Sequence, residues 1–205
     1  MTSGPRVVAY GRFAKGWAHA AAGNYEAALR ECQESLRIAP DAASRAYASA
    51  FLGYSYLVKG EPSAALDLLE QAVRSFSAFH FPAFEALFGA KLAETRLALG
   101  DIEGARTAAT RGRTIAINCG YRYGLGWACR AMAHTAGAVG QNAEARELLL
   151  EARCIFAEIG AAIELQRTLQ AIASCAFRSQ ESACSAVPEA EGEGAEVEVF
   201  APTIR

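Results

Sequence analysis

One short pattern recurs four times along this 205-residue chain: a glycine followed five residues later by an alanine. The four glycines are Gly23, Gly60, Gly100 and Gly140, and they lie 37, 40 and 40 residues apart. Each lies between two amphipathic stretches of helical composition. A period of this length with helical flanks is typical of solenoids built from helical hairpins. The repeat therefore predicts a stack of antiparallel helix pairs, an architecture that usually binds other molecules and rarely catalyses reactions.

The hydrophobic periodicity predicts nine helices and an all-α fold. They cover residues 5–22, 25–38, 42–59, 62–78, 82–99, 102–117, 121–139, 142–158 and 161–177. The first eight form four pairs, in which the recurring glycine ends the first helix because a C-cap needs the left-handed conformation. We expect Asn24, Asp101 and Asn142 to cap the second helices. The ninth helix has no partner and is expected to cover the end of the stack.

The chain divides into a repeat domain and an acidic tail. We place the α-solenoid at residues 1–178, with repeat units at about 9–42, 46–79, 86–119 and 126–159 followed by the capping helix. Residues 179–205 are rich in glutamate and glycine and contain little that a core could bury, so we expect them to be disordered.

Composition and charge exclude several functional classes. The net charge is −2, which does not favour a nucleic-acid-binding protein. No apolar run is long enough to span a bilayer. We therefore expect a cytoplasmic protein with no membrane partner. The six cysteines form no C-x-x-C pair and no metal-ligand spacing, so reduced structural thiols are favoured over disulfides or metal ligands.

The first two units carry residues that identify a known repeat. In the first unit these are Gly16, Gly23, Tyr25, Ala28, Ser35 and Pro40; in the second they are Gly53, Tyr56, Gly60, Ala65 and Ala72. The pattern resembles the tetratricopeptide repeat. The third and fourth units match less well, because Arg96 and Ala136 occupy the aromatic position of the first helix and the terminal proline is absent. The resemblance implies a solenoid in which the first helix of each pair lines a concave groove.

The 40-residue spacing and the segment from Phe156 to Leu169 resemble a narrower group. These are the C-terminal repeat arrays of bacterial multidomain signalling proteins that contain an ATPase or an adenylate/guanylate cyclase. The chain contains no G-x-x-x-x-G-K-[ST] motif, so any catalytic activity is expected to belong to an upstream domain.

The groove positions of the family fall on ten residues of this chain. They are Tyr10, Phe13, Trp17, Tyr47, Tyr54, Leu87, Glu94, Trp127, Arg130 and His134. Tyrosine and tryptophan dominate interaction hot spots, so the set predicts a surface for an extended peptide or a partner helix. The alternative is that about half of these aromatic residues fill gaps between adjacent hairpins. A second aromatic cluster, Phe76, Phe79, Phe81, Phe84 and Phe88, is expected to pack at the turn between the second and third units.

No combination of residues points to catalysis, a metal or a cofactor. The histidines lie on different predicted elements, and none has a carboxylate or cysteine at ligand spacing on its own helix. We therefore expect a non-catalytic protein-interaction scaffold that binds a protein or peptide in its concave groove. The alternative is a regulatory repeat fragment of an ATPase- or cyclase-type signalling protein. The partner's identity and the oligomeric state are left open by the sequence.

Overall fold

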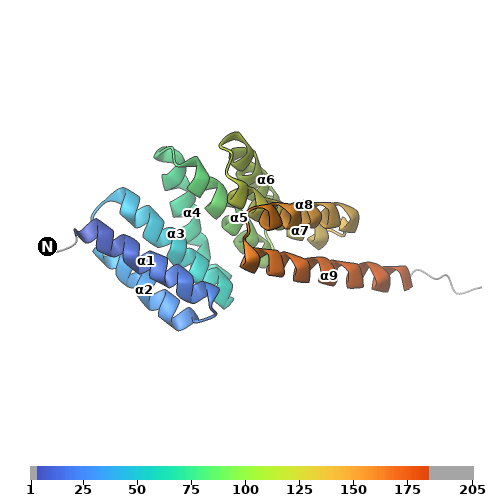
Figure 1. Ribbon diagram of the computed structural model, residues 1–205, viewed down its shortest axis with the longest axis horizontal. Helices are drawn as coiled ribbons and strands as arrows, with labels where there is room; N and C mark the ends of the chain where they lie inside the picture. The colour runs from blue at the N-terminus through green and yellow to red at the C-terminus, as the bar shows by residue number, and fades with distance from the viewer. Residues whose placement is uncertain (1–3, 185–205) are drawn as a thin grey trace, which may run out of the picture.

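The described part of the chain, residues 4–184 of a computed structural model, is an array of nine α-helices without a strand (Figure 1). The helices are α1 (Pro5–Ala21), α2 (Tyr25–Ile38), α3 (Ala42–Lys59), α4 (Pro62–Ala78), α5 (Pro82–Ala98), α6 (Ile102–Asn118), α7 (Arg122–Ala138), α8 (Asn142–Glu158) and α9 (Ala162–Cys184). The predicted all-α solenoid is confirmed, and the ends of the first eight helices agree with the prediction to within one residue.

A left-handed residue separates most consecutive helices; the exception is the α2–α3 connection, where Ala39 is extended. The recurring glycines turn the chain within each pair, and Gly60, for example, has φ 91° after the last residue of α3. A second series of left-handed residues lies in the turns between pairs. The repeat pattern did not reveal this series. Gly120 and Gly160 have φ 70° and 68°, and His80 takes the same place 40 residues earlier with φ 55°. Both series disfavour residues with a Cβ atom, so they fix where each helix stops.

Helices pack closely within and between pairs. The members of each pair, α1 with α2 through α7 with α8, form the most extensive contacts, and each second helix also packs on the next first helix. Small residues permit this approach: a Cβ atom at Gly53 of α3 would lie 2.8 Å from Cγ of Leu69 in α4. Most of the buried side chains on α6 and α8 are likewise alanines and leucines.

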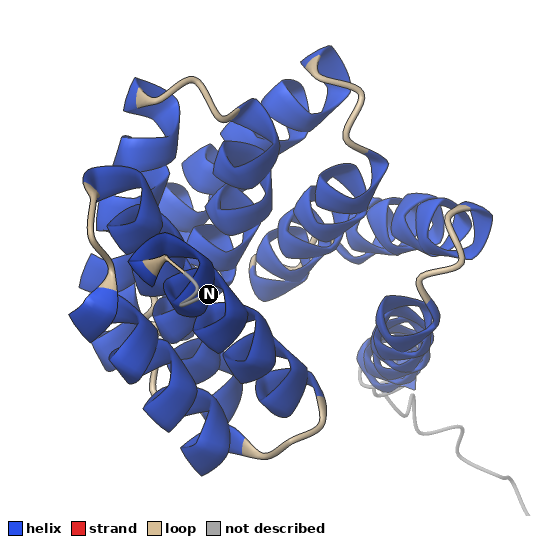
Figure 2. Ribbon diagram, turned by 60° about the vertical axis from the view of Figure 1, so that its left-hand side comes forward, coloured by secondary structure: helices blue, strands red, loops and turns tan. Residues whose placement is uncertain are grey.

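The array bends between its second and third units. The first helices α1 and α3 pack together, as do α5 and α7, but α3 and α5 approach each other much less closely. Figures 1 and 2 accordingly show α1–α4 as one group of helices and α5–α9 as another. The two groups are joined mainly by the packing of α4 on α5.

Two aspartates cap helices in the structure. The Asp41 carboxylate accepts a 2.8 Å hydrogen bond from the Ser44 amide at the start of α3, and Asp101 accepts one from the Gly104 amide. The prediction for Asp101 is confirmed. Asn24 also occupies its predicted N-cap position, although its side chain makes no capping bond. The prediction for Asn142 is wrong by one residue, because Gln141 is the N-cap and Asn142 is the first residue of α8.

Helix α9 is longer than predicted. It ends at Cys184, so the predicted end at residue 177 and the predicted start of the tail at residue 179 are wrong. The prediction followed the change in charge, but no glycine or proline lies within α9 to stop it. The rest of the predicted disordered tail, residues 185–205, lies outside the described residues. No helix in the described part of the chain is long and apolar enough to cross a membrane.

Replacing His80 by glycine is expected to stabilise the fold. A residue with a Cβ atom loses about 1–2 kcal/mol in the left-handed conformation, and the greater freedom of glycine in the unfolded chain offsets part of that gain. We expect His80→Gly to raise the free energy of unfolding by up to about 1 kcal/mol, measured by urea denaturation. As a control, Arg30→Gly inside α2 is expected to lower it by about 1 kcal/mol. A destabilised His80→Gly protein contradicts the prediction.

Removing the Asp41 cap is expected to lower stability in a pH-dependent way. The Ser44 amide and, secondarily, Arg6 lower the pKa of Asp41 from 3.8 to about 2. A carboxylate whose pKa falls on folding stabilises the protein above its unfolded-state pKa, and this stabilisation is lost as the pH falls towards the folded-state value. Asp41→Ala is thus expected to lower the Tm at pH 7. The difference from the wild type should shrink between pH 3.8 and about 2 in thermal melts followed by circular dichroism; a difference that stays constant over this range excludes the cap as its cause.

Candidate functional site

All ten residues predicted to line the groove lie on first helices, but at different depths. Tyr10, Phe13 and Trp17 are on α1, Tyr47 and Tyr54 on α3, Leu87 and Glu94 on α5, and Trp127, Arg130 and His134 on α7. The accessible members are Trp17, His134 and the half-buried Tyr10, Phe13 and Tyr47. Tyr54, Leu87, Trp127 and Arg130 are each less than 9% exposed, and Glu94 is mostly covered. The sequence thus identified the correct helices, but it did not distinguish the exposed residues of this set from the buried ones.

Six accessible aromatic residues form a connected set. We call it the aromatic face and define it as Tyr10, Phe13, Trp17, Tyr47, Phe81 and Phe84. Five of these rings are linked by direct ring contacts, and Trp17 is connected to them through the buried Phe51 ring. The Tyr10 ring lies 5.3 Å from Phe13 and 5.5 Å from Tyr47, and the Tyr47 ring lies 4.7 Å from Phe84. Each member is half-buried or exposed, and Trp17 is 37% exposed. The face therefore extends from α1 over α3 to the start of α5, across the place where α3 and α5 separate.

Buried rings support the aromatic face from below. Phe51 stacks on Phe13 at 4.7 Å and also contacts Trp17 and Phe88, while Phe76 contacts Tyr47 and Phe84. The predicted packing of the second aromatic cluster is confirmed for Phe76 and Phe88, which are buried. Phe81 and Phe84 also pack against this core and remain partly exposed, whereas Phe79 is 37% exposed. The second aromatic cluster therefore continues into the rings of α1 and α3.

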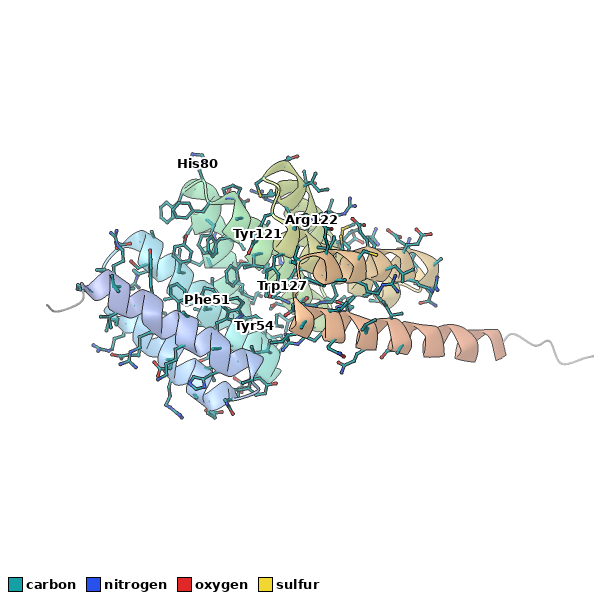
Figure 3. The ribbon with its side chains drawn as sticks, viewed as in Figure 1. Phe51, Tyr54, His80, Tyr121, Arg122 and Trp127 are labelled. Carbon is teal, nitrogen blue, oxygen red and sulfur yellow. The ribbon has the colours of Figure 1, made fainter. Side chains whose placement is uncertain are left out.

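The deeper predicted residues join the two halves of the array. Trp127 of α7 stacks on Tyr54 of α3 with ring centroids 5.9 Å apart, and the Lys91 ammonium of α5 lies 3.7 Å from the centre of the Trp127 ring. Figure 3 shows Tyr54 and Trp127 meeting near the middle of the molecule. A cation held against an aromatic face in a site without water is strongly attracted to it. Side chains from three first helices thus fill the centre of the predicted groove.

Two ion pairs complete this interior cluster. Lys91 donates to Glu94 at 2.8 Å, and Arg130 pairs with Glu164 of α9 at 2.6 Å. Glu164 also pairs with Arg167 at 3.2 Å. Except for Glu94 and Arg167, these side chains are at most 6% exposed. Helix α9 is therefore attached to the array through a buried charge pair, and the interior residues are available to a partner only if the helices around them separate.

The interior alters the titration of its charged groups. Burial lowers the pKa of Lys91, although Glu94 partly opposes the change. Burial alone would raise the pKa of Glu94, but Lys91, Arg130 and His134 outweigh it and lower that pKa. Burial also raises the pKa of Tyr54, against a hydrogen bond from Arg167. Glu94 therefore stays ionised beside cationic neighbours, as a structural ion pair requires.

Among the described residues, no group of three His, Cys, Asp or Glu side chains is placed to hold a metal ion. Cys32 and Cys129 are buried thiols whose pKa burial raises to about 11, which makes them poor nucleophiles. The predicted groove residues thus provide aromatic contact area and paired charges, which are suited to binding.

Comparison with protein families supports the repeat assignment. The profile of the tetratricopeptide repeat family matches residues 9–34, which is most of the first hairpin. No curated protein sequence matches the chain. The first hairpin is thus a tetratricopeptide repeat, and the predicted resemblance to this repeat is confirmed.

Solved structures share the fold of the whole array. A Rap protein complexed with competence and sporulation factor has a TM-score of 0.73 at 15% identity, covering 86% of this chain and 50% of its own. Aspartyl phosphate phosphatase F from Bacillus subtilis has a TM-score of 0.66 at 14% identity, covering 88% and 48%. A kinesin light chain protein from Podospora anserina with nearly identical TPR-like repeats has a TM-score of 0.61 at 19% identity, covering 89% and 92%.

At sequence identities of 14–19%, the similarity to these structures shows a shared fold. This chain spans about half the length of the Rap and phosphatase F structures. Together with the family match over residues 9–34, these arrays show that the chain has a helical-repeat fold. The narrower resemblance to arrays of ATPases and cyclases stays a prediction.

Breaking the buried pair between α7 and α9 is expected to be strongly destabilising. Arg130→Met leaves the Glu164 carboxylate buried without its closest partner, so we expect a loss of about 3 kcal/mol in the free energy of unfolding. The double variant Arg130→Met/Glu164→Leu should recover much of that loss, since it removes both charges. Arg146→Met on the exposed face of α8 serves as the control. A single variant that unfolds at the same urea concentration as the control would show that the pair does not hold α9.

Proposed function

We propose that this chain is a non-catalytic interaction module that binds an extended segment of a partner protein or peptide on its aromatic face. The observation that carries the proposal is the contiguity of five partly exposed rings from α1 to the start of α5, to which Trp17 is connected through Phe51. Isolated surface aromatics are common, but a connected set of this kind marks an interaction site. The predicted groove residues Tyr10, Phe13, Trp17 and Tyr47 belong to this face.

The rings provide both affinity and orientation. Tyrosine and tryptophan offer a large contact area with few rotatable bonds, and their polar tips can donate hydrogen bonds to a partner backbone. The supporting layer of Phe51 and Phe76 holds the rings in place, so little side-chain entropy is lost on binding. An extended segment with apolar side chains fits a row of rings that crosses successive helices.

Charged pairs lie on another side of α1. Arg12 and Lys15 both pair with Glu31 of α2, each at 2.7 Å, and both keep more than 40% of their side chains exposed. These pairs lower the pKa of Glu31, so it stays ionised near neutral pH. At about 3.6 residues per turn, Arg12 and Lys15 lie on the side of α1 away from Phe13 and Trp17, so the pairs leave the aromatic face uncovered.

The structural neighbours add support. A Rap protein has been solved in complex with competence and sporulation factor, and that array matches 86% of this chain. The observation concerns the Rap protein and supports the idea that an array of this shape can hold a partner. The described residues that could suggest catalysis, the buried thiols and the interior carboxylates, are paired or have raised pKa values.

Peptide selection tests the proposal directly. A displayed library of random twelve-residue peptides is selected on the full chain, and the dissociation constants of the enriched peptides are measured by fluorescence anisotropy. Truncating hot-spot aromatics typically weakens binding by about 2 kcal/mol, so Tyr10→Ala/Trp17→Ala is expected to raise the dissociation constant at least about tenfold. The matched control is Tyr25→Ala/Leu99→Ala, which removes two exposed side chains outside the aromatic face.

Two outcomes would contradict the proposal. One is an enriched peptide that binds the Tyr10→Ala/Trp17→Ala variant as tightly as the wild type. The other is a selection that enriches no peptide. Circular dichroism melts of both double variants distinguish lost contact from lost fold, and the single variant Trp17→Ala repeats the test at the most exposed ring.

A further inference from the structure

A second concave site lies outside the aromatic face, where α4, α5 and α6 meet. It is a cleft of about 510 Å³. Its lining residues are Val73, Arg74, Ser77 and Ala78 of α4, Glu85, Gly89, Leu92 and Arg96 of α5, and Thr107, Ala108, Arg111, Gly112 and Ile115 of α6. The volume is in the range of small-molecule sites, about 300–1,000 Å³. Neither the repeat pattern nor the predicted groove includes it.

Two glycines form part of the floor of the cleft. Gly89 and Gly112 face each other between α5 and α6. A Cβ atom at Gly89 would meet no atom closer than 3.8 Å, whereas one at Gly112 would lie 3.2 Å from the Ala86 carbonyl oxygen. One repeat later, 40 residues along, the same positions are the buried residues Cys129 and Ala152. The third unit thus lacks side-chain atoms that the fourth unit has. The space is not needed for close helix packing at Gly89, since an alanine would fit there without a clash.

The walls of the cleft are largely apolar, and its charged groups are mostly positive. Val73, Leu92 and Ile115 provide branched aliphatic side chains. Three of the four charged lining residues are arginines. The fourth is Glu85, whose carboxylate is already paired with Arg111. Its carboxylate accepts two hydrogen bonds from Arg111, at 2.6 and 3.0 Å, and its side chain is only 9% exposed. A ligand therefore meets cationic groups and no free carboxylate among the lining residues.

The arginines at the rim retain donors for a further anion. Arg111 also donates to the Ser77 hydroxyl at 3.2 Å, which brings its guanidinium beside α4. Arg74 lines the cleft one helical turn earlier on α4. It donates to Glu70 at 3.2 Å through one nitrogen, and its side chain is 70% exposed. A guanidinium has five N–H donors in a fork that fits a carboxylate.

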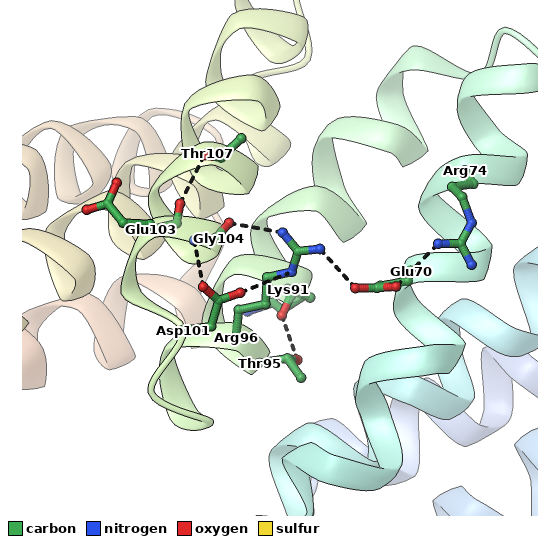
Figure 4. Close-up of polar contacts among 9 residues, drawn as sticks. All are labelled: Glu70, Arg74, Lys91, Thr95, Arg96, Asp101, Glu103, Gly104 and Thr107. Atoms are coloured by element: carbon green, nitrogen blue, oxygen red, sulfur yellow. Dashed lines mark hydrogen bonds and ion pairs between the residues drawn. The ribbon is translucent and has the colours of Figure 1, made fainter.

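The third arginine closes the other end of the cleft. Arg96 of α5 donates to Glu70 of α4 at 2.8 Å and to the Gly104 carbonyl of α6 at 3.3 Å, so one side chain connects all three helices (Figure 4). Because Glu70 also accepts from Arg74, both arginines lie at this end of the cleft. The other end, with Arg111 and Ser77, is therefore the side at which a ligand's charged group would be held.

We propose that this cleft binds a small amphipathic organic anion. The apolar body lies over Gly89, Leu92 and Ile115, and the carboxylate is held by Arg111 with the Ser77 hydroxyl beside it, while Arg74 adds positive charge to the cleft. Charge complementarity selects an anion over a cation, and the missing side chain at Gly89 provides room for an unbranched apolar chain. This site is independent of the aromatic face, so the failure of either proposal leaves the other intact.

Nuclear magnetic resonance titration with matched probes tests the site. Octanoate and octylammonium share one alkyl chain and differ in the sign of their charge. The full chain, labelled with ¹⁵N, is titrated with each, and the amide signals of Ser77, Gly89 and Gly112 are followed. We expect saturable shifts centred on these amides with octanoate, and at least about tenfold weaker binding of octylammonium.

Two pairs of variants locate the effect. Ala78→Trp fills the end of the cleft beside Ser77 and is expected to weaken octanoate binding at least about tenfold, whereas Ala143→Trp, on an exposed position of α8, should leave it unchanged. Arg74→Gln is expected to weaken it about threefold, in keeping with the strength of an exposed charge pair. Its control is Arg146→Gln on α8. Melting curves verify that each variant is folded.

Three results would overturn the proposal. They are octanoate shifts centred away from α4–α6, octylammonium binding as tight as octanoate binding, and octanoate binding that is unaffected by both Ala78→Trp and Arg74→Gln. The absence of any saturable shift with octanoate would overturn it as well. If Ala78→Trp does not fold, the proposal is still tested by the wild-type shift map and by the comparison of Arg74→Gln with Arg146→Gln.

Discussion

The stacking of Trp127 on Tyr54 is the contact on which the shape of the array depends. Consecutive first helices normally pack side by side, but α3 and α5 do not. The space between the halves is filled from further along the chain, by a tryptophan of the fourth unit and the Lys91 ammonium. A buried cation is tolerated only when it is paired and well packed, and here Glu94 and two aromatic rings satisfy it. The curvature of the array therefore depends on a few large side chains rather than on the repeat itself.

Helix α5 connects the two surfaces that this bend creates. Its residues Phe84 and Phe88 belong to the aromatic cluster, whereas Glu85, Gly89 and Leu92 line the cleft. Nearly every residue from Glu85 to Thr95 is buried, so the helix is packed on all sides. Because protein interiors are close-packed, a displacement of α5 at one surface changes side-chain positions at the other.

The sequence predicted the helices well because the relevant signals are local. A left-handed glycine ends a helix whatever surrounds it, and the apolar period follows from burial of one helix face. The prediction failed where no such local signal existed. His80 adopts φ 55° without being a glycine, and α9 continues past the start of the acidic segment because nothing in it stops a helix. The cleft depends on two glycines of different helices, and a repeat pattern does not show that they face each other.

The exposure of the candidate site residues could not be predicted from the sequence either. Trp17 and Trp127 occupy first helices and were equivalent in the sequence, yet the first is 37% exposed and the second 1%. What separates them is the number of helices around each one. Trp17 lies at the open end of the array, whereas Trp127 is enclosed by α3, α5 and the neighbouring helices of its own half. A repeat places its residues in equivalent local surroundings, but their exposure is set by the ends and bends of the stack. The two proposed sites accordingly lie where the repeat is interrupted: the aromatic face begins on the free first helix, and the cleft opens beside the bend.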